Sequence, residues 1–292
     1  MLHFVLNDRV NNVIDEDWIL RVDHLYKHFG PTCADCHQLT GPTQGRSHCP
    51  RCGTVWACVD VNLQLAKGEV LGIVGESGSG KSTLLQMIHL AVQPDRGHIW
   101  YRANGETAHD LTTLNRYEAR LFRNTHLGIV YQRPELGLNM RFSIGGNVAE
   151  KLLLAEWRHF GRIRARTTEL MVKTELPPER IDDEPPTFSG GMLQRVQIAK
   201  ALASRPAILL LDEITSGLDV SVQARILDLL RRIQWEDRIT MLLVSHDLGV
   251  VRQLARRTIV MKNGHIVEAG LTDQILEDPQ HPYTQLLVSS AL

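Results

Sequence analysis

The chain lacks any long hydrophobic run and any excess of charge of one sign. No stretch of about 18 uncharged apolar residues occurs, so no transmembrane helix is predicted. Asp8 and Arg9 also interrupt the N-terminus too early for the hydrophobic region of a secretory signal. Lys and Arg total 32 against 33 for Asp and Glu, and no long basic segment is present. We therefore expect a cytoplasmic protein that does not bind nucleic acid.

Internal repeats and low-complexity linkers are also missing, and no cysteine lies beyond residue 58. All five cysteines precede residue 59. In the reducing cytoplasm, paired cysteines are more often metal ligands or catalytic groups than disulfides. The 292 residues exceed the roughly 100–200 that are typical of one domain. We predict either one large domain with subdomains or two domains.

Five short apolar segments indicate strands that are buried on both faces. They cover residues 69–75, 127–132, 207–213, 241–247 and 258–261. Such segments are typical of a parallel sheet covered by helices, and the helical patterns at 81–92 and 221–235 fit the crossovers of an α/β fold. Residues from about 106 to 188 are mostly helical in pattern after Gln132, most clearly at 147–160 and 164–176. This block predicts an inserted helical subdomain.

The stretch GESGSGKS at residues 75–82 matches the phosphate-loop pattern G-x-x-x-x-G-K-[ST]. It lies between a predicted strand and a predicted helix, which disfavours the alternative of an accidental glycine-rich turn. The glycines let backbone amides face phosphate groups, Lys81 adds a positive charge, and the Ser82 hydroxyl can bind Mg²⁺. The predicted site for ATP and Mg²⁺ comprises Gly75, Glu76, Ser77, Gly78, Ser79, Gly80, Lys81, Ser82 and Thr83.

Polar residues end three further predicted strands. Asp212 is placed to bind Mg²⁺ through water, and Glu213 is placed to polarise the attacking water. His246 is placed to contact the γ-phosphate, and Gln132 ends its strand in the same manner. Taken alone, each has a plainer interpretation. The acidic pair could be a helix cap or a surface turn, His246 a structural histidine, and Gln132 an exposed amide. The phosphate loop favours the functional interpretation of the acidic pair.

The segment TFSGGMLQRVQIAKAL, at 187–202, resembles the signature segment of ABC-type ATPases. With the phosphate loop, Gln132, the Asp-Glu pair, SGLD at 216–219 and His246, the order and spacing are similar over residues 20–270. The resemblance implies a P-loop NTPase core of the RecA-like type, with an antiparallel β subdomain and a helical subdomain. It also implies one domain, residues 20–292, with an N-terminal extension at 1–19 and a tail at 270–292.

The resemblance assigns roles to residues of one subunit. Phe29 corresponds to the aromatic that stacks on adenine, and Gln132 to the residue that senses Mg²⁺ and the coupled partner. Glu213 and His246 correspond to the catalytic glutamate and the switch histidine. Mg²⁺-dependent ATP hydrolysis is thus implied, with Ser82, Asp212 and Gln132 around the metal.

Other roles belong to a dimer that encloses ATP between two subunits. Ser189, Gly190 and Gly191 correspond to contacts with the γ-phosphate held by the opposite subunit, and Asp219 to a residue of dimer communication. Met192 and Ile214 depart from the family pattern, which has Gln and Pro there. Neither departure removes a catalytic group, so we expect altered turnover at most.

Several segments resemble the ATP-binding subunits of the bacterial carbon-phosphorus lyase system, which degrades phosphonates. They are ERIDDEPPTFSGGM, GLDVSVQARILDLLR, VSHDLGVVRQLA and GLTDQILEDPQHPYTQLLVSS. The implied partners are a second ABC subunit, as homodimer or heterodimer, and the soluble lyase core complex. Dipeptide, oligopeptide and nickel importers share HPYT and LDVS, so membrane permeases at the inner membrane are the alternative partners. Chromosome- or ribosome-associated ABC proteins need coiled coils or a second such domain, which this chain lacks.

Two Cys-x-x-Cys pairs predict a metal site. Cys33, Cys36, Cys49 and Cys52 have zinc-ribbon spacing, with twelve residues between the pairs. Four thiolates leave no open coordination position, which favours a structural Zn²⁺; rubredoxin-like iron and reduced thiols are the alternatives. Residues 31–58 are interpreted as an insertion too small for its own core, which zinc would brace beside the nucleotide. His37 and His48 are reserve ligands by proximity, and Cys58 is left unpaired.

Overall fold

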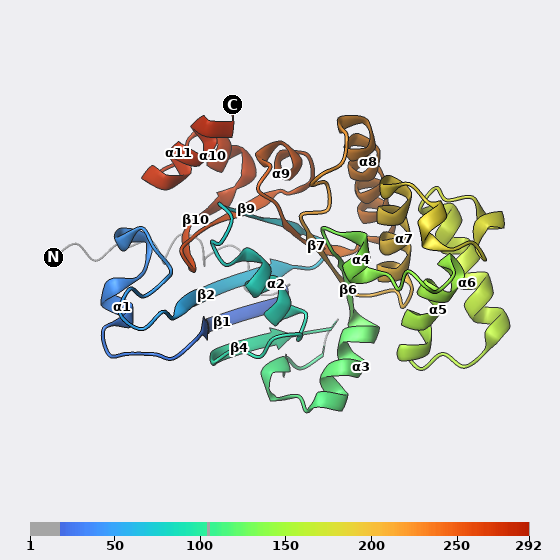
Figure 1. Ribbon diagram of the computed structural model, residues 1–292, viewed down its shortest axis with the longest axis horizontal. Coiled ribbons are helices and arrows are strands. Elements are labelled where there is room, and N and C mark those ends of the chain that lie inside the picture. Colours follow the sequence, from blue (N-terminus) through green and yellow to red (C-terminus); the bar gives the residue numbers. More distant parts are fainter. Residues whose placement is uncertain (1–17, 104–105, 292) are drawn as a thin grey trace. The chain divides into compact units, whose positions relative to one another are not determined.

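A computed structural model describes residues 18–103 and 106–291, which form two compact units (Figure 1). Of the described residues, the first unit combines 18–103 and 106–113 with 244–291, and the second spans 114–243. Of the expected N-terminal extension, residues 1–17 lie outside the described residues. Trp18 and Ile19 belong to the first strand, β1 (Trp18–Phe29).

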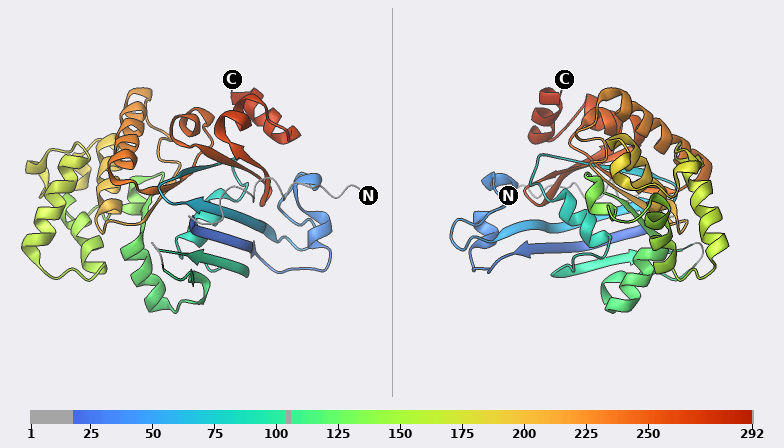
Figure 2. Two further views of the ribbon diagram at one scale, coloured as in Figure 1. Left: turned by 180° about the vertical axis from the view of Figure 1, so that it is seen from behind. Right: turned by 45° about the vertical axis from the view of Figure 1, so that its right-hand side comes forward.

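A four-stranded antiparallel sheet forms one part of the first unit. It contains β1, β2 (Val55–Ala66), β4 (Arg96–Tyr101) and β5 (His109–Asp110) in the order β2-β1-β4-β5. Leu20 pairs with Leu65 on one side and Tyr101 on the other, and all three side chains are buried. The three long strands run side by side in both views of Figure 2. This sheet is the antiparallel β subdomain that the family resemblance implied.

The first unit also contains the strands and helices around the phosphate loop. Strand β3 (Val70–Val74) pairs in parallel with β9 (Arg257–Lys262), which pairs with β10 (His265–Leu271) in an antiparallel hairpin. The hairpin turns at Asn263 and Gly264, with φ +47° and +83°, as a two-residue turn with two positive φ angles requires. The helices are α2 (Lys81–Ile88), α9 (Leu248–Leu254), α10 (Thr272–Glu277) and α11 (Pro282–Ala291), with the 3₁₀ turn η2 (Leu111–Thr113).

The cysteine-rich insertion lies between β1 and β2. It contains the short helix α1 (Cys36–Leu39) and the 3₁₀ turn η1 (Pro42–Gln44). Isolated bridges join Gly41 to Arg46 and His48 to Val55, so the insertion leads directly into β2. Its regular secondary structure is therefore small, as expected for a segment without its own core.

The second unit combines buried parallel strands with helices. Strands β6 (Leu127–Val130) and β7 (Ile208–Asp212) pair in parallel, and β8 (Thr240–Val244) lies next to β7. The helices are α3 (Arg116–His126), α4 (Pro134–Gly137), α5 (Ile144–Leu154), α6 (Phe160–Lys173), α7 (Gly190–Leu202) and α8 (Val220–Asp237). The 3₁₀ turns are η3 (Pro178–Arg180) and η4 (Pro185–Thr187). All five strands predicted from apolar runs are present.

The helical pattern at 147–160 does not form one helix. Helix α5 ends at Leu154, and Glu156 adopts a φ of +67°, which an α-helix cannot continue. Helix α6 begins only at Phe160, where the side chain of His159 accepts a hydrogen bond from the Arg162 amide at 3.2 Å. The apolar periodicity predicted the helical content but not this break.

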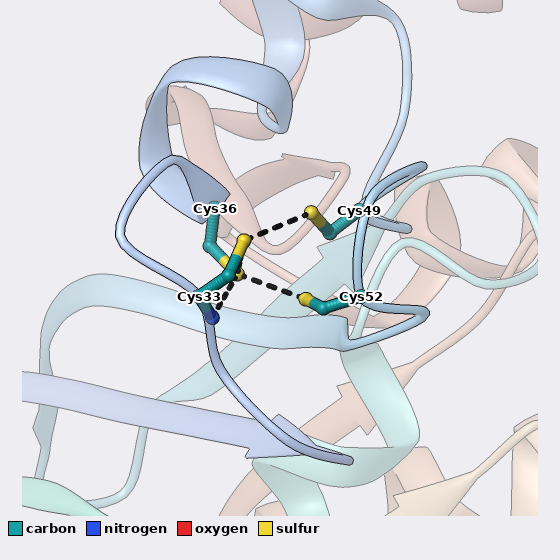
Figure 3. Close-up of side chains that lie close together, drawn as sticks. All are labelled: Cys33, Cys36, Cys49 and Cys52. Atoms are coloured by element: carbon teal, nitrogen blue, oxygen red, sulfur yellow. Dashed lines mark hydrogen bonds between the residues drawn. The ribbon is translucent and has the colours of Figure 1, made fainter.

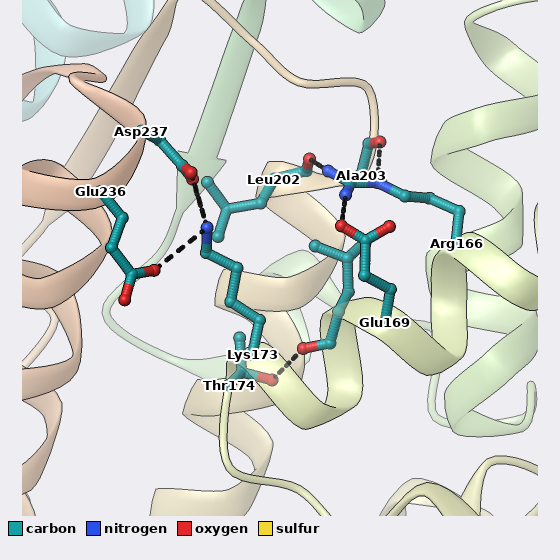
Figure 4. A network of polar contacts seen from close by, with 9 residues as sticks. Arg166, Glu169, Lys173, Thr174, Leu202, Ala203, Glu236 and Asp237 are labelled. Carbon is teal, nitrogen blue, oxygen red and sulfur yellow. Dashed lines mark hydrogen bonds and ion pairs between the residues drawn. The ribbon is translucent and has the colours of Figure 1, made fainter.

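Helix α6 is tied to the ends of α7 and α8 by charged side chains (Figure 4). The Arg166 guanidinium donates to the carbonyls of Leu202 and Ala203 at 3.0 and 3.3 Å, and Lys173 Nζ lies 2.6 Å from an Asp237 oxygen. Carbonyls at a helix C-terminus lack helical partners and carry partial negative charge, so a cation satisfies them well. Arg166 thereby fixes the C-terminal end of α7.

We expect Arg166→Ala to lower the free energy of unfolding by about 1.5–3 kcal/mol, because it leaves carbonyls of two buried residues without their charged donor. The matched control is Arg164→Ala on the same helix. Arg164 pairs with Asp182 at 2.7 Å in an exposed position, and such pairs contribute less than about 1 kcal/mol. Urea denaturation followed by circular dichroism compares the two variants, and equal losses would contradict the assigned role of Arg166.

Candidate nucleotide-binding site and cysteine cluster

The phosphate loop encloses its own lysine. The Lys81 side chain is buried, and its ammonium donates to the carbonyls of Gly75 at 2.7 Å and Glu76 at 2.8 Å. The Ser79 hydroxyl lies 3.4 Å from the same nitrogen. The main chain of the loop thus surrounds the positive charge of Lys81.

Two glycines let the loop approach other main-chain segments. Gly75 has φ +146°, and a Cβ there would lie 2.2 Å from the carbonyl oxygen of Met261 in β9. Gly80 has φ +108°, and its Cβ would lie 2.0 Å from the carbonyl oxygen of Ala57 in β2. Any side chain at either position would collide with backbone. One side of the loop is therefore buried against two strands.

The opposite side of the loop is exposed at Glu76, Ser77 and Gly78. Helix α2 starts at Lys81, so Ser82 and Thr83 lie in its first turn. The positive end of the helix dipole favours anions at such a position. The arrangement can bind a chain of phosphate groups, and the exposed Ser82 hydroxyl can serve a bound cation.

Two further predicted residues lie in the first unit. His246 is exposed immediately after Ser245, whose amide donates to the Ile73 carbonyl at 3.1 Å. The strand end that carries His246 is thus bonded to β3, which leads into the phosphate loop. Phe29 is 47 % exposed at the end of β1, with Lys27 Nζ 5.5 Å from its ring centroid.

Asp212 and Glu213 lie at the C-terminal end of strand β7 in the second unit. Asp212 is the last residue of the strand, and Glu213 adopts a left-handed φ of +47°. The Glu213 carbonyl accepts from the Ser216 amide at 3.0 Å, which closes a turn. A glutamate with positive φ is uncommon, and Glu156 and Glu175 of this chain share this conformation.

Gln132 is brought to the turn that follows Glu213. Its exposed side chain donates to the Ser216 hydroxyl at 3.0 Å. The preceding residue, Tyr131, is held by two buried glutamines of α7: its amide donates to Gln197 at 3.1 Å, and its carbonyl accepts from Gln194 at 3.2 Å. The position of Gln132 is therefore fixed through α7.

The signature segment begins helix α7 with exposed groups. Ser189 is the N-cap, and both Ser189 and Gly190 are exposed. Gly191 lies against α8, because a Cβ there would be 2.5 Å from Val222. Asp219 caps α8, and its bonds from the Ser221 hydroxyl and the Val222 amide lower the pKa of its carboxyl group.

The two departures from the family pattern have apolar environments. Met192 packs against a buried hydrophobic cluster that includes Phe188 and Leu193. Ile214 is 1 % exposed. Both side chains thus contribute to packing.

The four paired cysteines converge on one point, as predicted (Figure 3). Their sulfur atoms all lie within 4.8 Å of one another, and Cys33–Cys36, Cys33–Cys49 and Cys36–Cys52 are 3.6, 3.8 and 3.3 Å apart. Zn–S bonds of about 2.3 Å in a tetrahedron place sulfurs about 3.8 Å apart. The cluster therefore has the size and chemistry of a tetrahedral thiolate site.

The surroundings of the cluster distinguish its thiols. Hydrogen bonds from the Thr54 hydroxyl and amide lower the pKa of Cys52 to about 6. Partial burial and the neighbouring thiols raise the pKa of Cys33 to about 12. Several thiolates this close repel one another unless a cation lies between them. Four thiolates at this spacing would therefore require a cation between them.

The other predicted candidates lie outside this group. The His37 ring contacts Trp56 in a tilted arrangement with ring centroids 4.4 Å apart, and His48 is exposed where it bridges to Val55. Among the described residues, the ligand group contains only the four cysteines. Cys58 is fully buried, and burial raises the pKa of its thiol to about 12.

Sequence reasoning missed residues that support these sites. The Tyr283 hydroxyl accepts a hydrogen bond from the Glu76 amide at 3.0 Å, and Lys262 Nζ lies 4.4 Å from the Tyr283 ring centroid. Thr54 has its hydroxyl 3.2 Å from the Cys52 sulfur, and Trp56 packs against the cysteine cluster. In the sequence, the HPYT segment at 281–284 indicates only a resemblance to importer ATPases. Its contact with the phosphate loop joins segments 207 residues apart.

A family model described as ABC transporter matches residues 58–216. The chain belongs to this family, and it is an ABC-type ATPase. Among curated relatives, it is 51 % identical over 233 residues to PhnK of Escherichia coli (strain K12), which is named for phosphonates utilization and ATP binding. That match covers 80 % of this chain and 90 % of PhnK.

Other relatives carry transport names. The oligopeptide transport ATP-binding protein OppD of Bacillus subtilis (strain 168) is 41 % identical, and the match covers 82 % of this chain and 67 % of OppD. Among solved structures, the dimeric bacterial ABC transporter cassette MJ0796 has a TM-score of 0.71 and 28 % identity, over 87 % of this chain and 99 % of that one. A second structure of MJ0796, bound to ADP and Pi, scores the same at 27 % identity. The ABC cassette fold is thus confirmed.

None of the helices in the described residues is long and apolar enough to cross a membrane.

Proposed function

We propose that this protein is the cytoplasmic ATP-hydrolysing subunit that drives a soluble carbon-phosphorus lyase complex for phosphonate breakdown. The observation that carries the proposal is a phosphate loop that surrounds its own lysine. It occurs in a chain that is 51 % identical to PhnK, over 80 % of this chain and 90 % of PhnK. The second candidate is the motor subunit of a peptide-type importer, which the likeness to OppD favours.

The phosphate loop binds the β- and γ-phosphates of ATP through its amides and Lys81, and Phe29 stacks on the adenine. Ser82, Asp212 and Gln132 would hold Mg²⁺, with Asp212 acting through water. The exposed ring of Phe29 and the first-turn position of Ser82 support these roles.

Glu213 polarises the water that attacks the γ-phosphorus. The new bond forms between that water oxygen and phosphorus, and the bond from the γ-phosphorus to the bridging oxygen breaks, which releases ADP and phosphate. His246 contacts the transferred phosphoryl group. The fixed turn at Glu213 supports this role, because a base must be held in place to act on water.

The active form is a dimer in which each subunit completes the site of the other. The exposed Ser189 and Gly190 at the start of α7 form a second anion-binding position, which fits the γ-phosphate of the opposite subunit. Gly191 continues that turn and Asp219 mediates communication between subunits. The dimeric MJ0796 cassettes support this assembly, with either an identical copy or another ABC subunit as partner.

The cysteine cluster holds a structural Zn²⁺. Cys33, Cys36, Cys49 and Cys52 supply four thiolates, which close the coordination sphere and leave no position for a substrate. The bound ion supplies folding energy to the insertion. The close spacing of the sulfurs supports the assignment.

Glu213→Gln should hydrolyse ATP at least about 100-fold more slowly, because it removes a positioned base while keeping side-chain size. Binding of Mg²⁺-ATP should persist. Glu277→Gln, an exposed position that pairs with Arg252, is the matched control and should retain full turnover. Phosphate release under single-turnover conditions measures the rate, and normal hydrolysis by Glu213→Gln would refute the catalytic assignment.

Protein purified without added metal should contain about one zinc per chain, since one four-thiolate group is present. A thiol reagent at neutral pH should react little with the native protein. After the metal is removed by a chelator, the same reagent should react with four cysteines. Cys58 should react only on unfolding, because burial keeps its thiol neutral. Absence of metal together with four reactive thiols from the start would exclude the zinc site.

The partner assignment is tested by recovering the tagged full chain from cells grown on a phosphonate as phosphorus source. Soluble phosphonate-processing proteins should co-purify, and the amount recovered should depend on nucleotide. A tagged Lys81→Ala variant, which lacks the phosphate-binding cation, controls for that dependence. Recovery of membrane permeases in their place would favour the importer.

A further inference from the structure

The cysteine cluster and the phosphate loop contact the same short segment of β2. Cys52, the last of the four cysteines, lies five residues before Ala57 in the sequence. Trp56, between them, is buried and belongs to a hydrophobic cluster with Cys36 and Cys49. Its amide also donates to the Ser47 carbonyl at 2.8 Å. The start of β2 is therefore held by the insertion on the side of the cysteines.

The same segment forms the wall behind the phosphate loop. The Ala57 carbonyl faces Gly80 so closely that a Cβ at Gly80 would lie 2.0 Å from its oxygen. The sulfur of Cys58 lies 3.9 Å from the Gly80 carbonyl oxygen. Gly80 directly precedes Lys81, so a displacement of residues 56–58 would reach the phosphate-binding amides through main-chain contact.

The β9–β10 turn supplies a second link. The Gly264 amide donates to the Ser79 carbonyl at 3.0 Å, and its own carbonyl accepts from the Val59 amide at 2.8 Å. A Cβ at Gly264 would lie 2.7 Å from the Trp56 carbonyl oxygen. Residues 56–59 thus contact Gly80 of the phosphate loop directly, and they are linked to the preceding residue, Ser79, through Gly264.

From these contacts we infer that the cysteine cluster, when it holds its metal, positions the phosphate loop, so that metal binding and nucleotide binding strengthen each other. The inference rests on the metal and ATP sites of the proposed function. The insertion has little core of its own, so the metal restrains residues 33–52 and, through Trp56, the start of β2. Removal of the metal lets this wall move while every nucleotide-contacting group stays in the chain.

Reciprocity makes the coupling measurable from both directions. If the metal raises nucleotide affinity by some factor, nucleotide raises metal affinity by the same factor. Couplings between sites in one protein are typically on the order of 5- to 150-fold. Because the contacts are direct backbone packing, we expect a factor of about 10.

The experiment uses the full chain, loaded with zinc or stripped by a chelator. Titration with a fluorescent ATP analogue and Mg²⁺ gives the nucleotide Kd of each form. A chelator competition gives the zinc Kd with and without a non-hydrolysable ATP analogue. Both ratios should be about 10 and should agree. In Lys81→Ala, nucleotide should no longer change the zinc Kd.

Trp56→Leu should separate the two sites. It retains all four cysteines and the phosphate loop, so both ligands should bind, but the coupling factor should fall toward one. Trp100→Leu is the matched control, because Trp100 lies in β4 of the same sheet and contacts His98, with ring centroids 5.6 Å apart. This control should keep the full coupling.

Independent binding of zinc and nucleotide in the wild type would overturn the inference and leave the proposed function intact. Failure to bind zinc would refute the metal assignment, whereas failure to bind nucleotide would refute the ATPase assignment. Global loss of circular dichroism on stripping would also overturn the inference, since the metal would then hold the whole fold.

Discussion

The burial of one side of the phosphate loop is the constraint on which the surrounding structure depends. The amides of the loop must face the ligand, so the opposite side packs against neighbouring strands. The carbonyls of Ala57 and Met261 fill that side, and they come from β2 and β9. The antiparallel sheet and the C-terminal strands are therefore parts of the nucleotide site, although they supply little of its recognised motif.

The two kinds of strand differed in how well the sequence predicted them. Strands such as β3 and β7 are buried on both faces and form continuous apolar runs, so their positions could be predicted directly. Strands β1 and β2 are partly exposed and their register shifts repeatedly, with His24 and Asp60 at positive φ. Irregular pairing of this kind destroys a simple alternation of apolar and polar residues. Only the family resemblance anticipated this sheet.

The candidate sites show the same division between local and distant contacts. The phosphate loop and the four cysteines were predictable because spacing in the sequence specifies both. The contact of Tyr283 with Glu76 and the packing of β2 behind Gly80 join segments that only the folded chain brings together. No periodicity or spacing carries such information. The role of Asp219 as a helix cap is a local feature that the family likeness had left unstated.

The left-handed conformation of Glu213 has opposite consequences for the stability of the fold and for the proposed reaction. An L-amino acid in this region costs roughly 1–2 kcal/mol, whereas glycine pays almost no such penalty. A glycine at this position would therefore favour the folded chain but lack the carboxylate. If Glu213 has the catalytic role proposed above, selection for thermal tolerance alone would favour an inactive protein, and retention of glutamate there in engineered or evolved variants would mark selection for turnover.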